Sequence, residues 1–330
     1  MMLSQREKVD LLRNSSTYSH ETNPEIDVIE TNISWVFLTG KYVYKMKKEI
    51  QFGDILDFST LEKREQACKN ELKYNRRLAP DLYLDSVILT SDLKINGEGE
   101  PLEYLVKMQQ LDQSALLQEK INRGQEITDE FLLKLAQTIV KFHKENIVIP
   151  QFSVYENIFE KWDENFRTTR NYPNFPFDED LARRVYNYME NNKKYFENRG
   201  DERKIVDGHG DLILANIFES DGDAIIFDCI EFNEMLRIQD ILEEIAFLAM
   251  DLDFQGMTDK SVLFLKEYLN EMEGALKPDS TIINFYKSYR AYVRAKVFFS
   301  QSLQEQSEEK RTKIVGLATK YMKLSSSYHF

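Results

Sequence analysis

The sequence predicts an α+β fold in two lobes, with a small antiparallel sheet and one helix followed by a mainly helical part. Two observations indicate this. Runs of alternating apolar and polar residues are concentrated in the first third of the chain, and from about Gln109 the apolar residues recur at helical spacing. No internal repeat or long linker separates the two regions. We therefore expect a hinge near residues 108–112 between a first lobe, 1–108, and a second lobe, 109–330.

The composition indicates an ordinary globular protein. The 330 residues are 42% hydrophobic and 30% charged, which is enough apolar material for a sizeable core. The formal net charge of −13 disfavours nucleic acid or an anionic membrane as a main partner, because like charges repel. The chain has no apolar run of membrane-spanning length and no apolar core of a signal peptide near its start, so we expect a cytoplasmic protein.

The cysteines and histidines do not indicate a metal site. Cys68 and Cys229 are the only cysteines, and neither has a CxxC partner. The four histidines are scattered without zinc-binding spacing, and His143 at the end of an apolar helix is expected to be packed or capping. We expect both cysteines to be reduced and buried.

The first lobe is predicted to contain strand, strand, helix, strand and strand, after an amphipathic helix at about residues 3–13. The alternation in "ISWVFLTGKYVYKMKK" predicts a hairpin with Gly40 in the turn. Ser59 and Glu62 form a capping-box pattern that begins a helix, and Pro80 ends it. Two further strands are predicted from "LYLDSVILT" and "EYLVKMQQL".

The second lobe is predicted to be helical at residues 113–122, 127–146, 153–168 and 178–197, and again toward the end of the chain. A different pattern interrupts these helices. The short apolar strand "KIV" leads into "VDGHGDLILAN", and "NIFESDGDAIIFDC" predicts a hairpin with Asp221 and Gly222 in its turn. The second strand of this hairpin runs back alongside the first, so Asp228 is expected at the end where the first strand begins.

Asp211, Asn216 and Asp228 form the pattern that indicates chemistry. A tight turn that offers Asp211 to a substrate hydroxyl, with Asn216 and Asp228 binding Mg²⁺, is the layout that phosphoryl transfer requires. Hard oxygen ligands suit magnesium, which keeps several waters and shares the phosphates. The alternative is that Asp211 and Asn216 cap a loop and Asp228 caps a helix.

These motifs carry a resemblance to a known family. With "SWVFLTG", "LDFSTLEKR", "NRRLAPDLYL", "FDCIEFN" and "YRAYVRAK", the chain from about Asn32 to Lys296 resembles the aminoglycoside phosphotransferase family of the protein-kinase-like fold, and within it a bacterial and archaeal branch. The resemblance implies ATP and Mg²⁺ as cofactors and a small-molecule hydroxyl, as in a sugar or an aminoglycoside, as the acceptor.

The resemblance also implies roles for individual residues. Asp211 corresponds to the catalytic aspartate of the family, and Asn216 and Asp228 correspond to its metal ligands. His209 is expected to brace the loop through hydrogen bonds. Cys229 stands where protein kinases have the phenylalanine of their DFG motif, so switching by a mobile phenylalanine is not expected.

In the first lobe, the resemblance implies that Lys45 binds the ATP phosphates and that Glu71 holds it in place. Two other acids of the same helix are competing partners, Glu62 and Glu65. The residues alone leave two further alternatives open. The lysines of "YVYKMKK" also fit a solvated charge run, and strand parity makes Lys47 as eligible as Lys45.

The nucleotide is expected to contact two further segments. No GxGxxG precedes the lysine strand, so "ETNISWVF" is predicted to form the phosphate-covering turn with Ser34 and backbone amides. Backbone groups of Lys107, Met108 and Gln109 are expected to face adenine, while the Met108 side chain also suits the core.

Four charged residues are candidates for binding the acceptor: Glu231, Asp240, Arg290 and Arg294. The two acids follow the metal ligand in the chain, and the two arginines share a helix face on which they would grip a carboxylate or phosphate. Two structural alternatives stay open. Arg237, Asp240 and Glu244 fit an exposed salt-bridged helix face, and the two arginines fit as partners of the acidic helix around Glu243.

The function indicated is an ATP-dependent phosphotransferase that acts on a small hydroxyl compound. One alternative is a protein kinase or a transferase of another part of the nucleotide. Another is a nucleotide-binding protein without turnover. The intact set of Asp211, Asn216 and Asp228 argues against the latter, because a binding protein needs no base.

Overall fold

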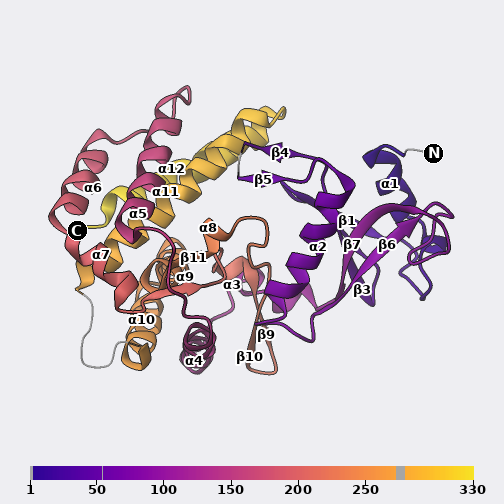
Figure 1. Ribbon diagram of the computed structural model, residues 1–330, viewed down its shortest axis with the longest axis horizontal. Helices are drawn as coiled ribbons and strands as arrows, with labels where there is room; N and C mark the ends of the chain where they lie inside the picture. The colour runs from indigo at the N-terminus through magenta and orange to yellow at the C-terminus, as the bar shows by residue number, and fades with distance from the viewer. Residues whose placement is uncertain (1–2, 54, 273–278) are drawn as a thin grey trace. The chain divides into compact units, whose positions relative to one another are not determined.

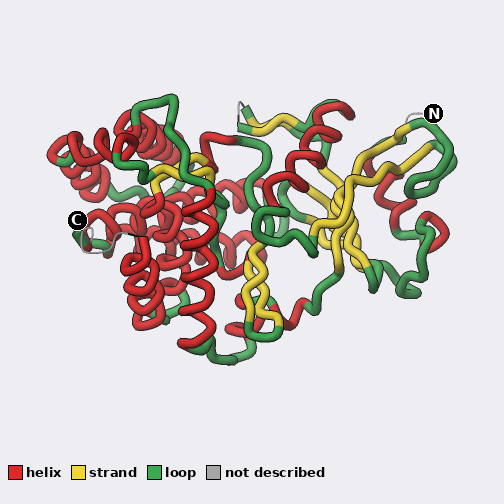
Figure 2. Tube along the Cα trace, turned by 60° about the horizontal axis from the view of Figure 1, so that its bottom comes forward, coloured by secondary structure: helices red, strands yellow, loops and turns green. Residues whose placement is uncertain are grey.

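The computed structural model describes residues 3–53, 55–272 and 279–330, which form two compact units. The first unit joins residues 1–120 to the later segments 216–220 and 225–236. The second unit consists of residues 121–215, 221–224 and 237–330. The predicted α+β class is confirmed, because the first unit contains an antiparallel sheet and the second is mainly helical (Figures 1 and 2).

A five-stranded antiparallel sheet in the order β1-β2-β3-β7-β6 organises the first unit. Its strands are β1 (Asp27–Glu30), β2 (Ser34–Leu38), β3 (Tyr42–Lys47), β6 (Tyr83–Thr90) and β7 (Pro101–Gln109). The predicted β2–β3 hairpin is confirmed, with Gly40 at a φ of 98° in its turn. Glycine adopts this left-handed value without a steric penalty. The sequence did not reveal β1, because this short strand is mostly exposed and shows no apolar alternation.

Helix α2 (Leu61–Asn75) packs on β6 and β7 (Figure 1). Its buried Cys68 and Leu72 join a core cluster that includes Tyr83 and Val106. The predicted capping residue was wrong by one position. Thr60 accepts the N–H of Lys63, whereas the Ser59 hydroxyl donates to Asp57 in the preceding strand. Residues 1–120 also contain α1 (Gln5–Leu12), η1 (Ser15–Thr17), β4 (Gln51–Phe52), β5 (Leu56–Asp57) and η2 (Gln113–Ala115).

The second unit contains α4 (Asp129–Glu145), α5 (Val154–Arg170), α6 (Glu179–Asn191), α7 (Lys193–Asp201), α9 (Ile241–Phe254), α10 (Thr258–Met272), α11 (Ser280–Gln304) and α12 (Glu308–Ser327). The helices predicted at 127–146 and 153–168 are confirmed by α4 and α5. The helix predicted at 178–197 is instead two helices, because the backbone leaves helical geometry at Asn192. The one predicted at 113–122 is shorter, with η2 followed by α3 (Leu117–Asn122).

Helix α9 lies in the core of the second unit and packs against α10 and α11. Every residue from Ile241 to Leu252 is buried, including the acids Glu243, Glu244 and Asp251. Buried charges require partners, so these acids mark where the helix contacts polar groups. None of the helices in the described ranges is both long enough and apolar enough to cross a membrane.

Short strands precede and follow the predicted catalytic segment in the sequence. β8 (Ile205–Asp207) pairs antiparallel with β11 (Ile238–Asp240), which leads directly into α9. The predicted hairpin is confirmed as β9 (Ile217–Ser220) and β10 (Asp223–Ile226), and Asp221 and Gly222 in its turn both have positive φ. Two short elements complete the chain, η3 (Leu214–Asn216) and α8 (Glu234–Arg237).

Candidate active site

The predicted site residues divide between the two units. The first unit holds Ser34, Lys45, Glu71, Lys107, Met108, Gln109, Asn216, Asp228 and Glu231. The second unit holds Asp211, Asp240, Arg290 and Arg294.

The first unit brings Lys45, Glu71 and Asp228 together. Lys45 Nζ lies 2.9 Å from Glu71 Oε1 and 2.5 Å from Asp228 Oδ1. Burial by itself would lower the pKa of Lys45, but the carboxylates of Asp228 and Glu71 raise that pKa well above its ordinary value. The lysine is therefore held in its charged form. Of the three acids considered for α2, Glu71 is the one that the structure places beside Lys45.

Lys47 is a second buried lysine on the same side of β3. Its Nζ lies 2.5 Å from Glu71 Oε2 and also contacts Glu231. Each Glu71 oxygen therefore binds a different lysine. The side chains of Lys45 and Lys47 are only 11% and 0% exposed, so the alternative of a solvated charge run is wrong for these two residues. Burial raises the pKa of Glu71, but the two lysines outweigh it and the net pKa is lowered.

Asp228 has an unusual backbone. Its φ of 63° lies in the left-handed region, which residues other than glycine rarely adopt. The Asp228 N–H donates to the Tyr83 hydroxyl at 3.0 Å, and the next N–H, of Cys229, donates to Asn75 Oδ1 at 2.7 Å. The Asp228 side chain is nevertheless 43% exposed. Strained backbone that neighbouring elements hold in place is typical of functional positions, and here it aims a carboxylate that solvent can reach.

Asn216 and Asp228 have the chemistry of magnesium ligands. Asn216 ends η3, and its carbonyl accepts the N–H of Phe227, the residue before Asp228, at 3.0 Å. An amide oxygen and a carboxylate are hard ligands that fit Mg²⁺, and the ion commonly takes its other oxygens from water and phosphate. Among the residues described, no three or more His, Cys, Asp or Glu side chains cluster as a metal site.

Ser34 does not lie in an exposed turn. It begins β2, opposite Lys47 in the register, and is fully buried. Its N–H donates to the Thr31 hydroxyl at 2.9 Å. This placement argues against the predicted contact between the Ser34 hydroxyl and a nucleotide phosphate, because the hydroxyl is enclosed by the sheet.

Lys107, Met108 and Gln109 end β7. Met108 is buried in the same core cluster as Cys68, so its side chain is part of the core. The Gln109 N–H donates to the Leu82 carbonyl at 2.8 Å and is already used within the first unit. Lys107 Nζ lies 3.9 Å from the centre of the Tyr42 ring. An adenine contact by the backbone of this segment stays a prediction.

In the second unit, Glu244 of α9 holds the segment that contains Asp211. Glu244 Oε1 accepts the His209 N–H at 2.6 Å, and the Gly210 N–H lies 3.2 Å from Glu244 Oε2. Gln239 Nε2 also donates to Glu244. The Asp211 N–H donates to His209 Nδ1 at 3.3 Å, which is the bracing that the resemblance implies. A buried carboxylate and an imidazole therefore fix the backbone around Asp211.

Asp251 supports the same segment further along. Its carboxylate accepts the Leu214 N–H at 2.9 Å. Glu244 and Asp251 are two helical turns apart on α9 and so share a face. Sequence reasoning missed both residues as supports of the loop. The signal was present, since acids within the apolar run "ILEEIAFLAMDL" require buried partners.

Gly208 makes the close approach of Glu244 possible. A Cβ at this position would lie 2.9 Å from both Cδ and Oε2 of Glu244. The carboxylate is held by its N–H donors, so it cannot move aside without losing them. We expect Gly208→Ala to destabilise the protein by about 1–3 kcal/mol in urea unfolding, as overpacking commonly does. The matched control is Gly316→Ala in α12, where a Cβ meets nothing within 4 Å and helix propensity favours alanine. Equal stability of the two variants would contradict this account.

Glu244 also predicts a pH dependence. Burial raises its pKa from 4.5 to about 7, against the opposing effects of Arg290 and the two N–H donors. Because the folded-state pKa is the higher one, the folded protein binds more protons than the unfolded chain between about pH 4.5 and 7. Stability from this group is therefore lost as the pH rises through that window. We expect wild type to lose on the order of 1–3 kcal/mol there relative to Glu244→Gln, measured by urea unfolding. Parallel pH profiles would contradict the assignment.

The predicted acceptor residues are mostly engaged in buried ion pairs. Asp240 caps α9 and binds Arg199 through both carboxylate oxygens, at 2.6 and 2.7 Å. Glu231 is paired with Lys47. We therefore correct the expectation that these two acids face an acceptor, since their charges are neutralised inside the protein. The alternative of an exposed helix face at Arg237, Asp240 and Glu244 was also wrong, because all three are buried.

The two arginines of α11 have different surroundings. Arg290 is buried, lies 3.3 Å from Glu243 Oε1 and donates to Gln239, in agreement with the structural alternative. Arg294 is less buried, and its guanidinium lies 4.7 Å from the centre of the Phe298 ring. Burial by itself would lower the pKa of Arg294, but Tyr321 and the negative charges of Asp211 and Asp251 raise that pKa above its ordinary value. Both arginines lie near the Asp211 segment, because Arg290 also donates to the Gly210 carbonyl at 3.4 Å.

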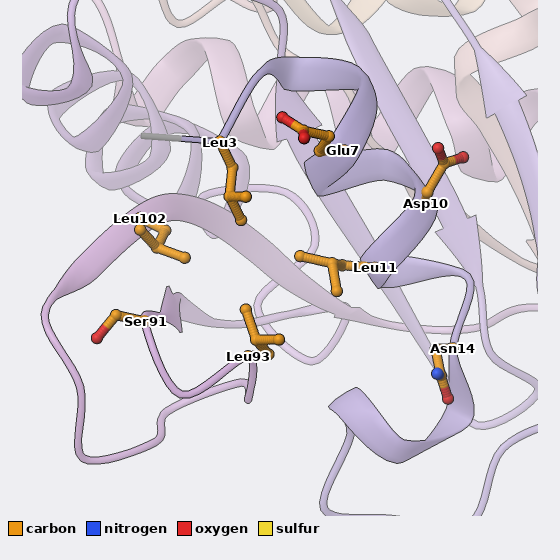
Figure 3. A pocket seen from close by; sticks show the side chains of 8 residues that line it. All are labelled: Leu3, Glu7, Asp10, Leu11, Asn14, Ser91, Leu93 and Leu102. Atoms are coloured by element: carbon orange, nitrogen blue, oxygen red, sulfur yellow. The ribbon is translucent and has the colours of Figure 1, made fainter. Parts of the chain in front are cut away.

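A separate hollow lies elsewhere in the first unit. It has a volume of about 440 Å³ and lies between α1 and the β6–β7 connection (Figure 3). Its lining is mainly apolar, from Leu3, Leu11, Leu93 and Leu102, with the acids Glu7 and Asp10 nearby. None of the predicted site residues lines it.

Comparison with solved structures identifies the fold. A choline/ethanolamine kinase family protein from Mesorhizobium loti aligns with a TM-score of 0.58 at 13% identity, over 99% of this chain and 96% of that one. The aminoglycoside phosphotransferase APH(2")-IIia, in a complex with GDP and kanamycin, aligns with a TM-score of 0.55 at 11% identity, over 94% and 96%. This chain has the kinase-like fold of those proteins. A microcompartment-associated aminopropanol kinase shares this fold, with a TM-score of 0.53 at 11% identity over 97% of each chain.

Comparison of sequences adds relatives without a described activity. Uncharacterized proteins of Mycobacterium tuberculosis and Mycobacterium bovis are 34% identical over 281 residues, which is 83% of this chain and 55% of theirs. The chain therefore spans about half the length of the curated relatives it matches. No protein-family model matches the chain.

Proposed function

We propose that this protein is an ATP-dependent phosphotransferase that moves the γ-phosphate to a hydroxyl group of a small molecule. The observation that carries the proposal is the contact of Lys45 with both Glu71 and Asp228. One acid of this cluster is fully buried and the other is partly exposed, so the lysine lies between a fixed partner and one that solvent reaches. The kinase-like fold supports the same function.

In this proposal the first unit binds the nucleotide. Lys45 is charged and donates to phosphate oxygens, and Glu71 keeps its ammonium group in place. Asn216 and Asp228 are the ligands for magnesium, which when bound neutralises charge on the phosphates. The Asp228 carboxylate is partly exposed, so it would be able to hold the ion in place of its contact with Lys45.

Asp211 acts on the acceptor. Its carboxylate accepts a hydrogen bond from the acceptor hydroxyl, which orients the oxygen and takes its proton as transfer proceeds. This role needs a rigid loop, because misplacing a reacting group by about 1 Å lowers the rate by roughly 10²-fold. The hydrogen bonds of Glu244 and His209 to the loop backbone supply that rigidity.

The acceptor class is proposed from the names of the structural neighbours. These proteins are described as acting on choline, ethanolamine or aminopropanol, or were solved with kanamycin bound. All of these are hydroxyl compounds that carry an amine or a quaternary ammonium group. Amino alcohols and aminoglycosides are therefore the first acceptors to test, and simple sugars test whether a hydroxyl group alone is enough. Both ATP and GTP belong in the assays, because the neighbours include ADP and GDP complexes.

Nucleotide and metal together are expected to stabilise the protein more than either alone. The reason is that phosphate oxygens complete the coordination begun by Asn216 and Asp228. Thermal unfolding with ATP, with Mg²⁺, with both, and with ATP plus EDTA measures this. The proposal predicts the largest rise in Tm with both ligands. The same rise for ATP in EDTA as in Mg²⁺ would remove the metal assignment, and no rise under any condition would remove the nucleotide site.

A further inference from the structure

A second lysine–acid pair lies behind the cluster of Lys45, Glu71 and Asp228. Lys47 is completely buried and contacts Glu231, whose side chain is only 3% exposed. Lys47 Nζ also lies 5.3 Å from the centre of the Phe58 ring, and Phe58 contacts Phe232, the neighbour of Glu231. The pair is therefore enclosed in the interior of the first unit and does not itself reach a ligand.

Glu71 connects this pair to Lys45. Its Oε1 binds Lys45 and its Oε2 binds Lys47. In the proposed function, Lys45 turns from Asp228 toward the phosphates. Glu71 has to stay fixed during that movement if it is to keep the Lys45 ammonium group in place, and a fully buried carboxylate is costly to leave partly unpaired. Lys47 provides this support, since it holds Oε2 while Oε1 stays with Lys45.

Glu231 links Lys47 to the position of Asp228. The two acids are three residues apart, and between them the Cys229 N–H is held by Asn75 of α2, the helix that also carries Glu71. The chain from Asp228 to Glu231 is thus attached to α2 at Cys229 and to β3 at Glu231. These attachments explain how Asp228 keeps its left-handed backbone while its carboxylate faces solvent.

We propose that Lys47 and Glu231 are positioning residues that hold Glu71 and Asp228 in place while Lys45 exchanges Asp228 for a nucleotide phosphate. This inference rests on the proposed function. Neither residue touches the nucleotide. The permanent Lys47–Glu231 pair stays closed, and the Lys45–Asp228 pair opens on binding.

The test uses a double variant, because either single substitution leaves a buried charge without its partner and risks unfolding. Lys47→Met with Glu231→Gln removes both charges and keeps similar volumes. Lys48→Met with Glu30→Gln is the matched control, because Lys48 and Glu30 form an ion pair at the end of the same strand and Glu30 is 66% exposed. We expect both double variants to fold, with melting temperatures close to that of wild type.

The expected result is a selective loss of binding. Calorimetry with Mg²⁺ and ATP should show at least a 10-fold weaker Kd for Lys47→Met/Glu231→Gln and an unchanged Kd for the control. Amide hydrogen exchange of residues 228–231 in the nucleotide-free protein should be faster in the first variant only. If Lys47 and Glu231 only stabilised the fold, their replacement would leave both the Kd and the exchange rate unchanged in a variant with the melting temperature of wild type. Wild-type affinity together with wild-type exchange would therefore overturn the inference.

The two proposals fail in distinguishable ways. If wild type itself does not bind Mg²⁺ and ATP, the proposed function is wrong. The hydrogen-exchange comparison then still decides whether Lys47 and Glu231 position the segment that carries Asp228: faster exchange in the variant supports the structural part of the inference, and unchanged exchange overturns it.

Discussion

Asp211→Asn is expected to lower phosphate transfer by roughly 10²- to 10⁴-fold, the usual contribution of a positioned general base. Asparagine keeps the shape of the side chain and one acceptor oxygen, but it loses the charge and the basicity that take the proton of the acceptor. Glu244, His209 and Asp251 support the loop through its backbone N–H groups, which this substitution leaves unchanged. The fold and nucleotide affinity should therefore be preserved.

Asp223→Asn is the matched control for this change. Asp223 begins β10, is exposed and has no predicted role. Transfer measured by a coupled assay and ATP affinity measured by calorimetry separate chemistry from binding. An Asp211→Asn protein that transfers phosphate at nearly the wild-type rate would refute the base assignment, and it would favour a nucleotide-binding protein without turnover.

Asp228→Asn should lower transfer by at least about 10²-fold and also remove the magnesium dependence of nucleotide binding, because a metal ligand loses its charge. The backbone conformation of Asp228 does not complicate this test. Asparagine adopts the left-handed φ of 63° at least as readily as aspartate does, so the substitution adds no strain. Lys45 loses one of its two acids but keeps Glu71. Calorimetry with ATP in Mg²⁺ and in EDTA measures the effect.

Asp221→Asn controls for the backbone conformation. Asp221 also has a left-handed φ, of 52°, but it lies in the exposed turn between β9 and β10. The Asp221→Asn variant should bind nucleotide and transfer phosphate as wild type does. Equal magnesium dependence in Asp228→Asn and wild type would show that Asp228 is not a metal ligand.

Much of the fold was predictable because the relevant signals are local. The β2–β3 hairpin, the β9–β10 hairpin and helices α4 and α5 each have a periodicity or a turn within a short window. The break at Asn192 was not predictable in this way, because apolar residues continue on both sides of it. Strand β1 was missed because edge strands with exposed side chains lack an apolar pattern.

The candidate site was predictable only where a motif carries the chemistry. Asp211, Asn216 and Asp228 lie within one short segment of the chain. The Lys47–Glu231 pair joins residues 184 positions apart, and a charged residue in a sequence is ordinarily expected at the surface. Glu244 was read as part of an exposed face for the same reason. Long-range pairing of buried charges has no local signature, so these supports appear only in the structure.

The most direct test of a phosphotransferase is the fate of the γ-phosphate itself. Phosphorus NMR of wild type with ATP, Mg²⁺ and a pool of amino alcohols, aminoglycosides and sugars follows it without a coupling enzyme. The account predicts that the γ-phosphate signal decays while a phosphate monoester signal grows, and that both changes are lost in Asp211→Asn. ATP that is bound, as the calorimetry detects, but remains intact with every hydroxyl compound in the pool would contradict transfer to such acceptors and would favour a nucleotide-binding protein without turnover.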